Sequence, residues 1–175
     1  RVETQNPVAI QLRIPTWSTS PRIQINGEDV EADVEPGTYY RLRRTWASGD
    51  VIDVDLGMQV LRMVAHPRLE QARGQVAVVR GPIVYCLESV DLPEDVAMQD
   101  VHLPRDARWT VRNDKDLLTG VTVLETEAVV VPGHDGSSAV YQELPDQPPR
   151  RIKIRLIPYY AWNNRGEPEM SVWLP

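Results

Sequence analysis

The sequence predicts an all-β protein, an antiparallel β-sandwich made either as one continuous sandwich or, as we expect, as two small stacked sub-sandwiches. Three observations predict this class. Apolar and polar residues alternate over short segments, which is the period-two pattern of half-buried strands. No window of about 11 residues shows the i, i+3, i+4, i+7 spacing of an amphipathic helix. The 15 prolines and 10 glycines divide the chain into short elements.

The first part of the chain contains strand-like segments separated by turn signals. In Val8–Ile14 the even-numbered positions are apolar, and Pro15 ends the segment. The segment that begins at Arg22 leads into Asn26-Gly27, the dipeptide most typical of a tight hairpin with positive φ angles. The strands expected here are Val8–Ile14, Arg22–Ile25, Tyr39–Trp46 and Val51–Leu56.

The remainder of the chain continues in strands. Gly81-Pro82 interrupts an apolar stretch, which predicts a bend or bulge within one long strand. The alternation weakens between Ser89 and Asp116, where we expect mainly loops. The strands expected in this part are Met58–Val64, Gln75–Arg80, Ile83–Leu87, Trp109–Val111, Val121–Val131, Arg151–Tyr160 and Met170–Leu174.

Composition excludes several classes of function. The net charge of −6 argues against nucleic-acid binding, which relies on Lys and Arg neutralising phosphates. No apolar stretch approaches the ~20 residues that span a bilayer, so we expect a soluble domain. The chain begins at Arg1 without Met or a signal-peptide pattern. It is therefore interpreted as a piece of a longer protein, whose compartment the sequence leaves open.

Two pairs of carboxylates invite comparison with hydrolase sites, since two carboxylates carry out most glycoside hydrolysis. The pairs Asp53/Asp55 and Glu125/Glu127 each share one face of a strand. Side chains at this spacing are parallel and do not converge across a cleft. We interpret both pairs as solvated outer faces of strands.

The other candidate reactive groups have no supporting motif. His66, His102 and His134 are far apart and lack the spacing of a metal-binding motif. The only cysteine, Cys86, lies in an apolar strand without an adjacent cation, which predicts a buried core thiol. We expect no catalytic residue, metal or cofactor in this chain.

Aromatic residues are the stronger candidates for a contact surface. Trp17 follows a predicted strand end, and the run Tyr159–Gly166 combines aromatic rings with amide and guanidinium donors. Such residues suit a protein interface or the stacking of a sugar ring. The candidate contact residues are Trp17, Tyr159, Tyr160, Trp162, Asn163 and Arg165.

The order of several motifs resembles a known family. Leu12–Trp17, Ile25–Gly27 and Arg44–Trp46 resemble the middle β-sandwich of glycoside hydrolase family 127, the bacterial β-L-arabinofuranosidase family. Gly74–Glu88 and Pro158–Gly166 resemble the start and the end of its C-terminal sandwich. The resemblance implies a middle sandwich in residues 1–66, incomplete at its N-terminus, and a C-terminal sandwich in residues 67–175.

The resemblance also implies a part that this chain lacks. Family members are similar in having an upstream catalytic (α/α)6 barrel, where a Cys nucleophile and further Cys and Glu ligands hold zinc. Cys86 does not match the family's nucleophile motif, so the resemblance carries no catalytic or metal role to any residue here.

Two functions follow as hypotheses. In the first, the chain is a non-catalytic accessory region that packs against the barrel of the same chain, with the aromatic run at the domain junction. In the second, it is a carbohydrate-binding module that stacks sugars on exposed Trp and Tyr. The sequence decides neither the sugar specificity of the parent nor the oligomeric state.

Overall fold

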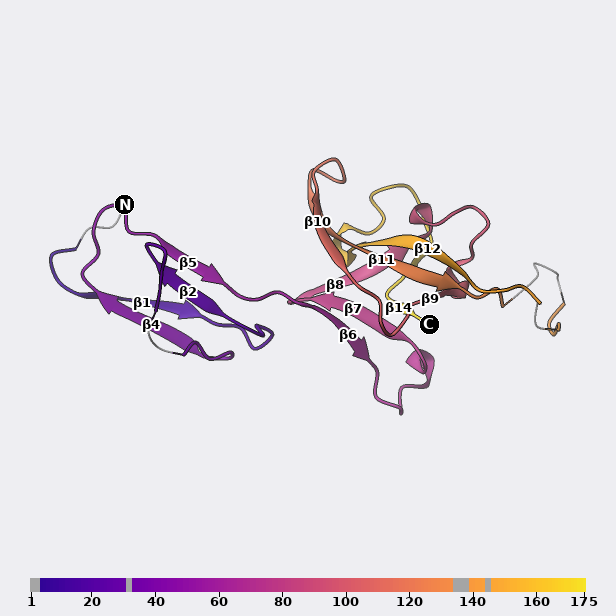
Figure 1. Cartoon of the computed structure of the whole chain (residues 1–175), viewed down its shortest axis with the longest axis horizontal. Helices are drawn as coiled ribbons and strands as arrows, with labels where there is room; N and C mark the ends of the chain where they lie inside the picture. Colours follow the sequence, from indigo (N-terminus) through magenta and orange to yellow (C-terminus); the bar gives the residue numbers. More distant parts are fainter. Residues whose placement is uncertain (1–3, 31–32, 134–138, 144–145) are drawn as a thin grey trace. The chain divides into compact units, whose positions relative to one another are not determined.

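The protein forms two compact units in a computed structural model that describes residues 4–30, 33–133, 139–143 and 146–175. The units comprise Arg1–Gln59 and Val60–Pro175 (Figure 1). The described residues contain strands and short 3-10 helices and no α-helix, which confirms the all-β prediction. None of the helices in the described part is long and apolar enough to cross a membrane.

The first unit consists of two small antiparallel sheets. Strand β1 (Val8–Arg13) pairs with β4 (Tyr39–Arg44). Strand β2 (Arg22–Ile25) pairs with both β3 (Glu28–Asp29) and β5 (Ile52–Asp55). Apolar side chains from both sheets meet in a core whose buried members are Ile14, Ile23, Leu42 and Trp46.

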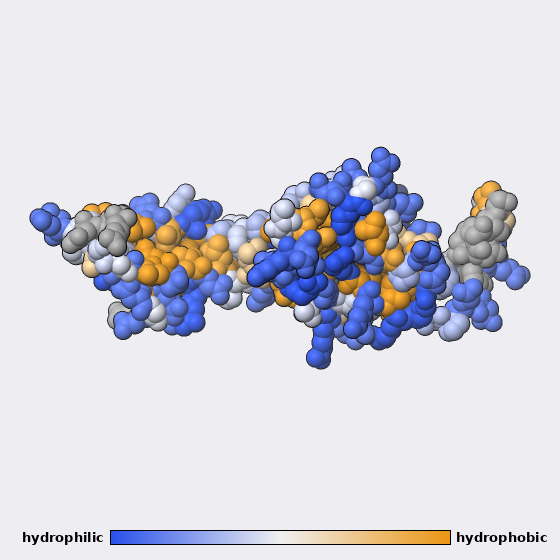
Figure 2. Space-filling view, turned by 90° about the horizontal axis from the view of Figure 1, so that it is seen from above, coloured by the Kyte–Doolittle hydropathy of each residue, from blue (hydrophilic) through white to orange (hydrophobic). Residues whose placement is uncertain are grey.

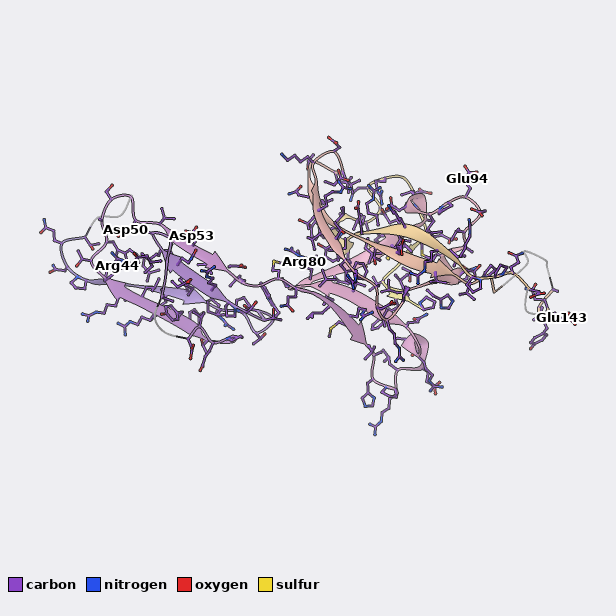
Figure 3. The ribbon with its side chains drawn as sticks, in the orientation of Figure 1. Arg44, Asp50, Asp53, Arg80, Glu94 and Glu143 are labelled. Carbon is purple, nitrogen blue, oxygen red and sulfur yellow. The ribbon has the colours of Figure 1, made fainter. Side chains whose placement is uncertain are left out.

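The hairpin between β2 and β3 turns at Asn26-Gly27, as predicted. Their φ angles are 53° and 86°, the left-handed values of a tight hairpin turn. The Asn26 side chain accepts a hydrogen bond from Val51 N–H (2.8 Å) and donates one to Asp50 (2.9 Å). These two hydrogen bonds connect the β2–β3 hairpin turn to the turn that precedes β5. Asp50 also lies 3.9 Å from the Arg44 guanidinium (Figure 3).

The second unit is organised around one large antiparallel sheet. Its main path runs in the order β10-β11-β12-β8-β7-β14, while β6, β9 and β13 pair with β7, β11 and β8 respectively. The strands are β6 (Val60–Val64), β7 (Val76–Arg80), β8 (Ile83–Glu88), β9 (Val101–His102), β10 (Thr110–Asp114), β11 (Val121–Val130), β12 (Arg150–Pro158), β13 (Met170–Ser171) and β14 (Trp173–Leu174).

Gly81-Pro82 forms a hairpin turn between two strands, so the prediction of a bend or bulge within one long strand is wrong. Arg80 pairs with Ile83 and Val79 with Val84 across this turn, in antiparallel register. Gly81 has a φ of 58°, a left-handed conformation that reverses the chain and that glycine adopts without strain. The alternation of apolar residues is the same on both sides of such a turn, which is why the sequence pattern resembles one strand.

The large sheet buries apolar side chains on both of its faces. One face carries the main core, with Tyr85 and Leu87 of β8 among its buried members. The other face carries a smaller cluster with Cys86 of β8 and Ile157 of β12. Because successive side chains of a strand point to opposite faces, β8 contributes to both clusters. Short 3-10 helices η1 (Glu70–Ala72), η2 (Ser89–Asp91), η3 (Met98–Asp100) and η4 (Tyr159–Ala161) lie in the connections.

Candidate functional site

Three exposed aromatic side chains, Tyr159, Tyr160 and Trp162, form what we call the aromatic platform. They follow directly on β12, where Pro158 has no amide hydrogen to donate and the chain turns into η4. Trp162 N–H donates to the carbonyl of Tyr159 (3.1 Å), which closes the turn. The exposed fractions of the three residues are 46%, 69% and 38%. The Tyr159 and Trp162 ring centroids lie 6.1 Å apart with planes inclined by 21°.

A buried carboxylate anchors the loop that carries this platform. Glu88, the last residue of β8, is fully buried. One of its oxygens accepts the Asn163 N–H (3.0 Å), and the other accepts Arg165 Nε (2.9 Å). Asn163 has a φ of 64°, a left-handed conformation that asparagine tolerates better than most residues. The Glu88 side chain therefore holds the segment after η4 at two positions, the Asn163 backbone amide and the Arg165 guanidinium.

Arg165 joins this anchor to a longer network. Its two terminal nitrogens donate to both carboxylate oxygens of Asp91, at 2.9 and 2.6 Å. Asp91 also accepts from Arg155, whose guanidinium reaches Asp114 at 3.4 Å. Arg112 completes the series with contacts to Asp114 and Glu125. We call Glu88, Asp91, Arg112, Asp114, Glu125, Arg155 and Arg165 the arginine–carboxylate network.

Ion pairs keep Asp91 charged although this residue is shielded from water. Burial opposes ionisation of Asp91, but hydrogen bonds from Arg165 and Arg155 outweigh it and hold the pKa of Asp91 below its usual value. Hydrogen bonding to Asp91 in turn raises the pKa of the Arg165 guanidinium. Removing one member would leave a shielded charge without its partner, which is costly.

Cys86 lies beneath this region as a core residue, as predicted. Its side chain packs among Val123, Ile157 and Ala161, and the residue is 1% exposed. Burial, followed by the nearby charge of Glu88, raises the pKa of its thiol to about 12. The thiol is therefore protonated at neutral pH and is a poor nucleophile.

The candidate contact residues from the sequence fall into two groups. Tyr159, Tyr160, Trp162 and Asn163 lie together on the exposed loop after β12. Arg165 lies beside them, but its guanidinium points inward to Glu88 and Asp91. Trp17 belongs to the other compact unit, where it is half-buried in the turn after β1.

Sequence reasoning missed the acidic members that anchor the platform, Glu88 and Asp91. Both follow the apolar stretch of β8, and their arginine partner is 74 to 77 positions away along the chain. A signal does exist, since Glu88 ends an otherwise apolar strand and shares a strand face with Cys86. A carboxylate in that position requires a cation nearby.

The other candidate carboxylates and histidines in the described part of the chain lie apart from one another. The carboxylates Asp53, Asp55 and Glu127 are exposed on strands, as expected of outer faces. His66 and His102 lie in separate segments, and His134 lies outside the described residues. Within the described ranges, no group of three or more His, Cys, Asp or Glu side chains is arranged to hold a metal ion.

Comparison with known protein families accounts for both units. Residues 1–58 match the family described as beta-L-arabinofuranosidase, GH127 middle domain. Residues 60–175 match the glycoside hydrolase family 127 C-terminal domain. The two matches together cover nearly the whole chain, in the order that the sequence motifs suggested.

Individual relatives are much longer than this chain. A non-reducing end beta-L-arabinofuranosidase of Bifidobacterium longum is 35% identical over 97% of the chain, which spans 26% of that protein. A solved structure described as a glycoside hydrolase superposes with a TM-score of 0.84 at 34% identity, over 97% of this chain and 28% of its own. A GH127 beta-L-arabinofuranosidase from Geobacillus stearothermophilus gives 0.79 at 38% identity, over 97% and 27%.

Proposed function

The chain belongs to glycoside hydrolase family 127, and we propose that it forms the non-catalytic middle and C-terminal β-domains of a longer glycoside hydrolase. The chain spans little more than a quarter of the relatives that it matches. Cys86, the only thiol, is buried with a pKa of about 12, which agrees with a structural role. The parent protein is then a β-L-arabinofuranosidase-like hydrolase whose chemistry resides upstream.

The domains support an upstream catalytic barrel of the same chain, and the aromatic platform is the surface that contacts it. The observation that carries this proposal is the contrast between an exposed platform and its buried anchor. Glu88 is fully buried, whereas Tyr160 is 69% exposed. Burying a charge is costly unless it is paired. Buried ion pairs of Glu88 and Asp91 with Arg165 nevertheless hold the loop that exposes the platform.

The character of the surface agrees with a protein contact. Tyr and Trp are enriched at interfaces because they combine a large apolar area with a polar group. Figure 2 shows that apolar residues other than Tyr and Trp also reach the surface of each unit on the side in view. A preorganised loop also lowers the entropic cost of association.

The test compares the full-length parent with its Tyr159→Ala/Trp162→Ala variant. If the platform contacts the barrel, the double variant lowers the melting temperature of the full-length protein and leaves that of the present chain nearly unchanged. Equal shifts in both proteins contradict the contact. A saturable, glycan-selective change in Trp fluorescence of the isolated chain, lost in the variant, would instead assign the platform to sugar binding.

A further inference from the structure

A hollow of about 640 Å³ in the second unit has a basic rim. Its lining residues come from the end of β6, the loop to η1, the start of β7 and the segment around Leu103. Arg62, Arg73, Arg105 and His66 contribute to its lining. Among the described residues, no Asp or Glu side chain lines this hollow, but Pro175 does, and in this chain it carries the terminal carboxylate. The three arginines therefore outnumber the one negative group of the lining.

The guanidinium groups of the rim are available to a ligand. Arg62 donates to the carbonyl of Pro104 (2.9 Å), which is a neutral partner that orients the guanidinium. Arg73 lies 3.5 Å from Glu70, with both side chains more than 60% exposed, so this pair is weak. Arg105 is exposed, and none of the ion pairs found among the described residues includes it.

The floor of the hollow is apolar. Ala72 and Leu103 are 6% and 9% exposed, and Val76 is half-buried beside them. An apolar floor beneath a cationic rim favours a ligand with a flat apolar body and a negatively charged end, because each part then meets its complement. Arg is well suited to the charged end, since its planar donors match carboxylate and phosphate oxygens.

We propose that this hollow binds a small organic anion. Arg62 and Arg105 hold its carboxylate or phosphate group, and Ala72, Val76 and Leu103 contact its apolar body. The site is separate from the aromatic platform, and the proposal does not depend on the function proposed above. It adds a ligand-binding role to a region that the family assignment describes only as a C-terminal domain.

The test titrates the whole chain with phenyl phosphate, benzoate and the neutral isostere benzamide, and follows backbone and arginine Nε–H NMR signals. We expect saturable shifts at Arg62, Gly74 and Arg105 with both anions and none with benzamide. The stronger anion identifies whether phosphate or carboxylate is preferred. Arg105→Gln should weaken binding about tenfold, as expected for loss of a charge-assisted hydrogen bond.

Arg43→Gln is the matched control, because Arg43 is an exposed arginine on β4 of the first unit. This variant should bind both anions as the unaltered chain does. Equal weakening by Arg105→Gln and Arg43→Gln would overturn the proposal, because it would show general charge screening. Shifts spread over all exposed arginines, or equal shifts with benzamide, would also overturn it.

Discussion

Glu88 and Arg165, which are 77 positions apart in the sequence, form an ion pair at the base of the exposed aromatic loop. Glu88 is completely buried, and the Arg165 side chain is 15% exposed. The pair connects the end of β8 to the loop after η4. It therefore fastens the segment that follows Tyr159 and Trp162 to the buried end of β8.

Replacing Glu88 by Gln should destabilise the chain by about 3 kcal/mol, because Arg165 then loses one of its two carboxylate partners in a shielded site. Urea unfolding measures the loss. The matched control is Glu127→Gln, whose exposed pair with Arg151 should contribute less than about 1 kcal/mol. Equal losses in the two variants would contradict the anchoring role of Glu88.

The ionisation of Asp91 should make stability depend on pH. Its pKa is lowered in the folded state from an ordinary 3.8, so ionised Asp91 stabilises the fold at higher pH. This contribution is present above the unfolded-state pKa and is lost as pH falls through the lower folded-state pKa. The difference in free energy of unfolding between the unaltered chain and Asp91→Asn should therefore narrow as pH falls below 3.8. If the two proteins differ in free energy of unfolding by the same amount above and below pH 3.8, the lowered pKa of folded Asp91 is contradicted.

Cys86 should not react with iodoacetamide in the folded chain. Its thiol is buried, and a pKa of about 12 leaves almost no thiolate at pH 8. Mass spectrometry should show no alkylation in native buffer and complete alkylation in urea. Alkylation of the native chain at the rate of a free thiol would show that the thiol is accessible and ionised.

Replacing Gly27 by Val should destabilise the chain by about 1–2 kcal/mol. The cost comes from the backbone, because Gly27 has a φ of 86° and an added Cβ would meet no atom within 4 Å. Gly27→Asn is the control, since asparagine tolerates left-handed φ angles and should cost less. If thermal unfolding gives the same melting temperature for both variants, strain at this turn is not the cause.

The strand pattern was largely predictable, because period-two alternation reports local burial. The bounds of β1 (Val8–Arg13) and β11 (Val121–Val130) lie within one residue of the predicted ones, although Val8 is exposed and Val123 and Leu124 are both buried. The alternation does not report which strands pair, so β8 pairing with both β12 and β13 could not be anticipated. The two-residue strands β3 and β9 are too short to show alternation.

The candidate site was predictable in part for the same reason. The aromatic run is continuous in sequence, so its residues were found together. Its anchor is assembled from β8 and η2 by tertiary pairing, and no local pattern relates Glu88 or Asp91 to Arg165. Arg165 was grouped with the surface donors because the sequence does not show that its guanidinium is paired with Glu88 and Asp91.

The most direct test of the central claim measures the solvent exposure of Trp162 in the isolated chain and in the full-length parent. Chains labelled with 5-fluorotryptophan give separate 19F signals, and Trp162→Phe identifies the signal of Trp162. We predict that a soluble paramagnetic agent broadens this signal in the isolated chain and that the signal is protected in the full-length protein. Equal broadening in both proteins would contradict the proposal that the aromatic platform contacts the upstream domain.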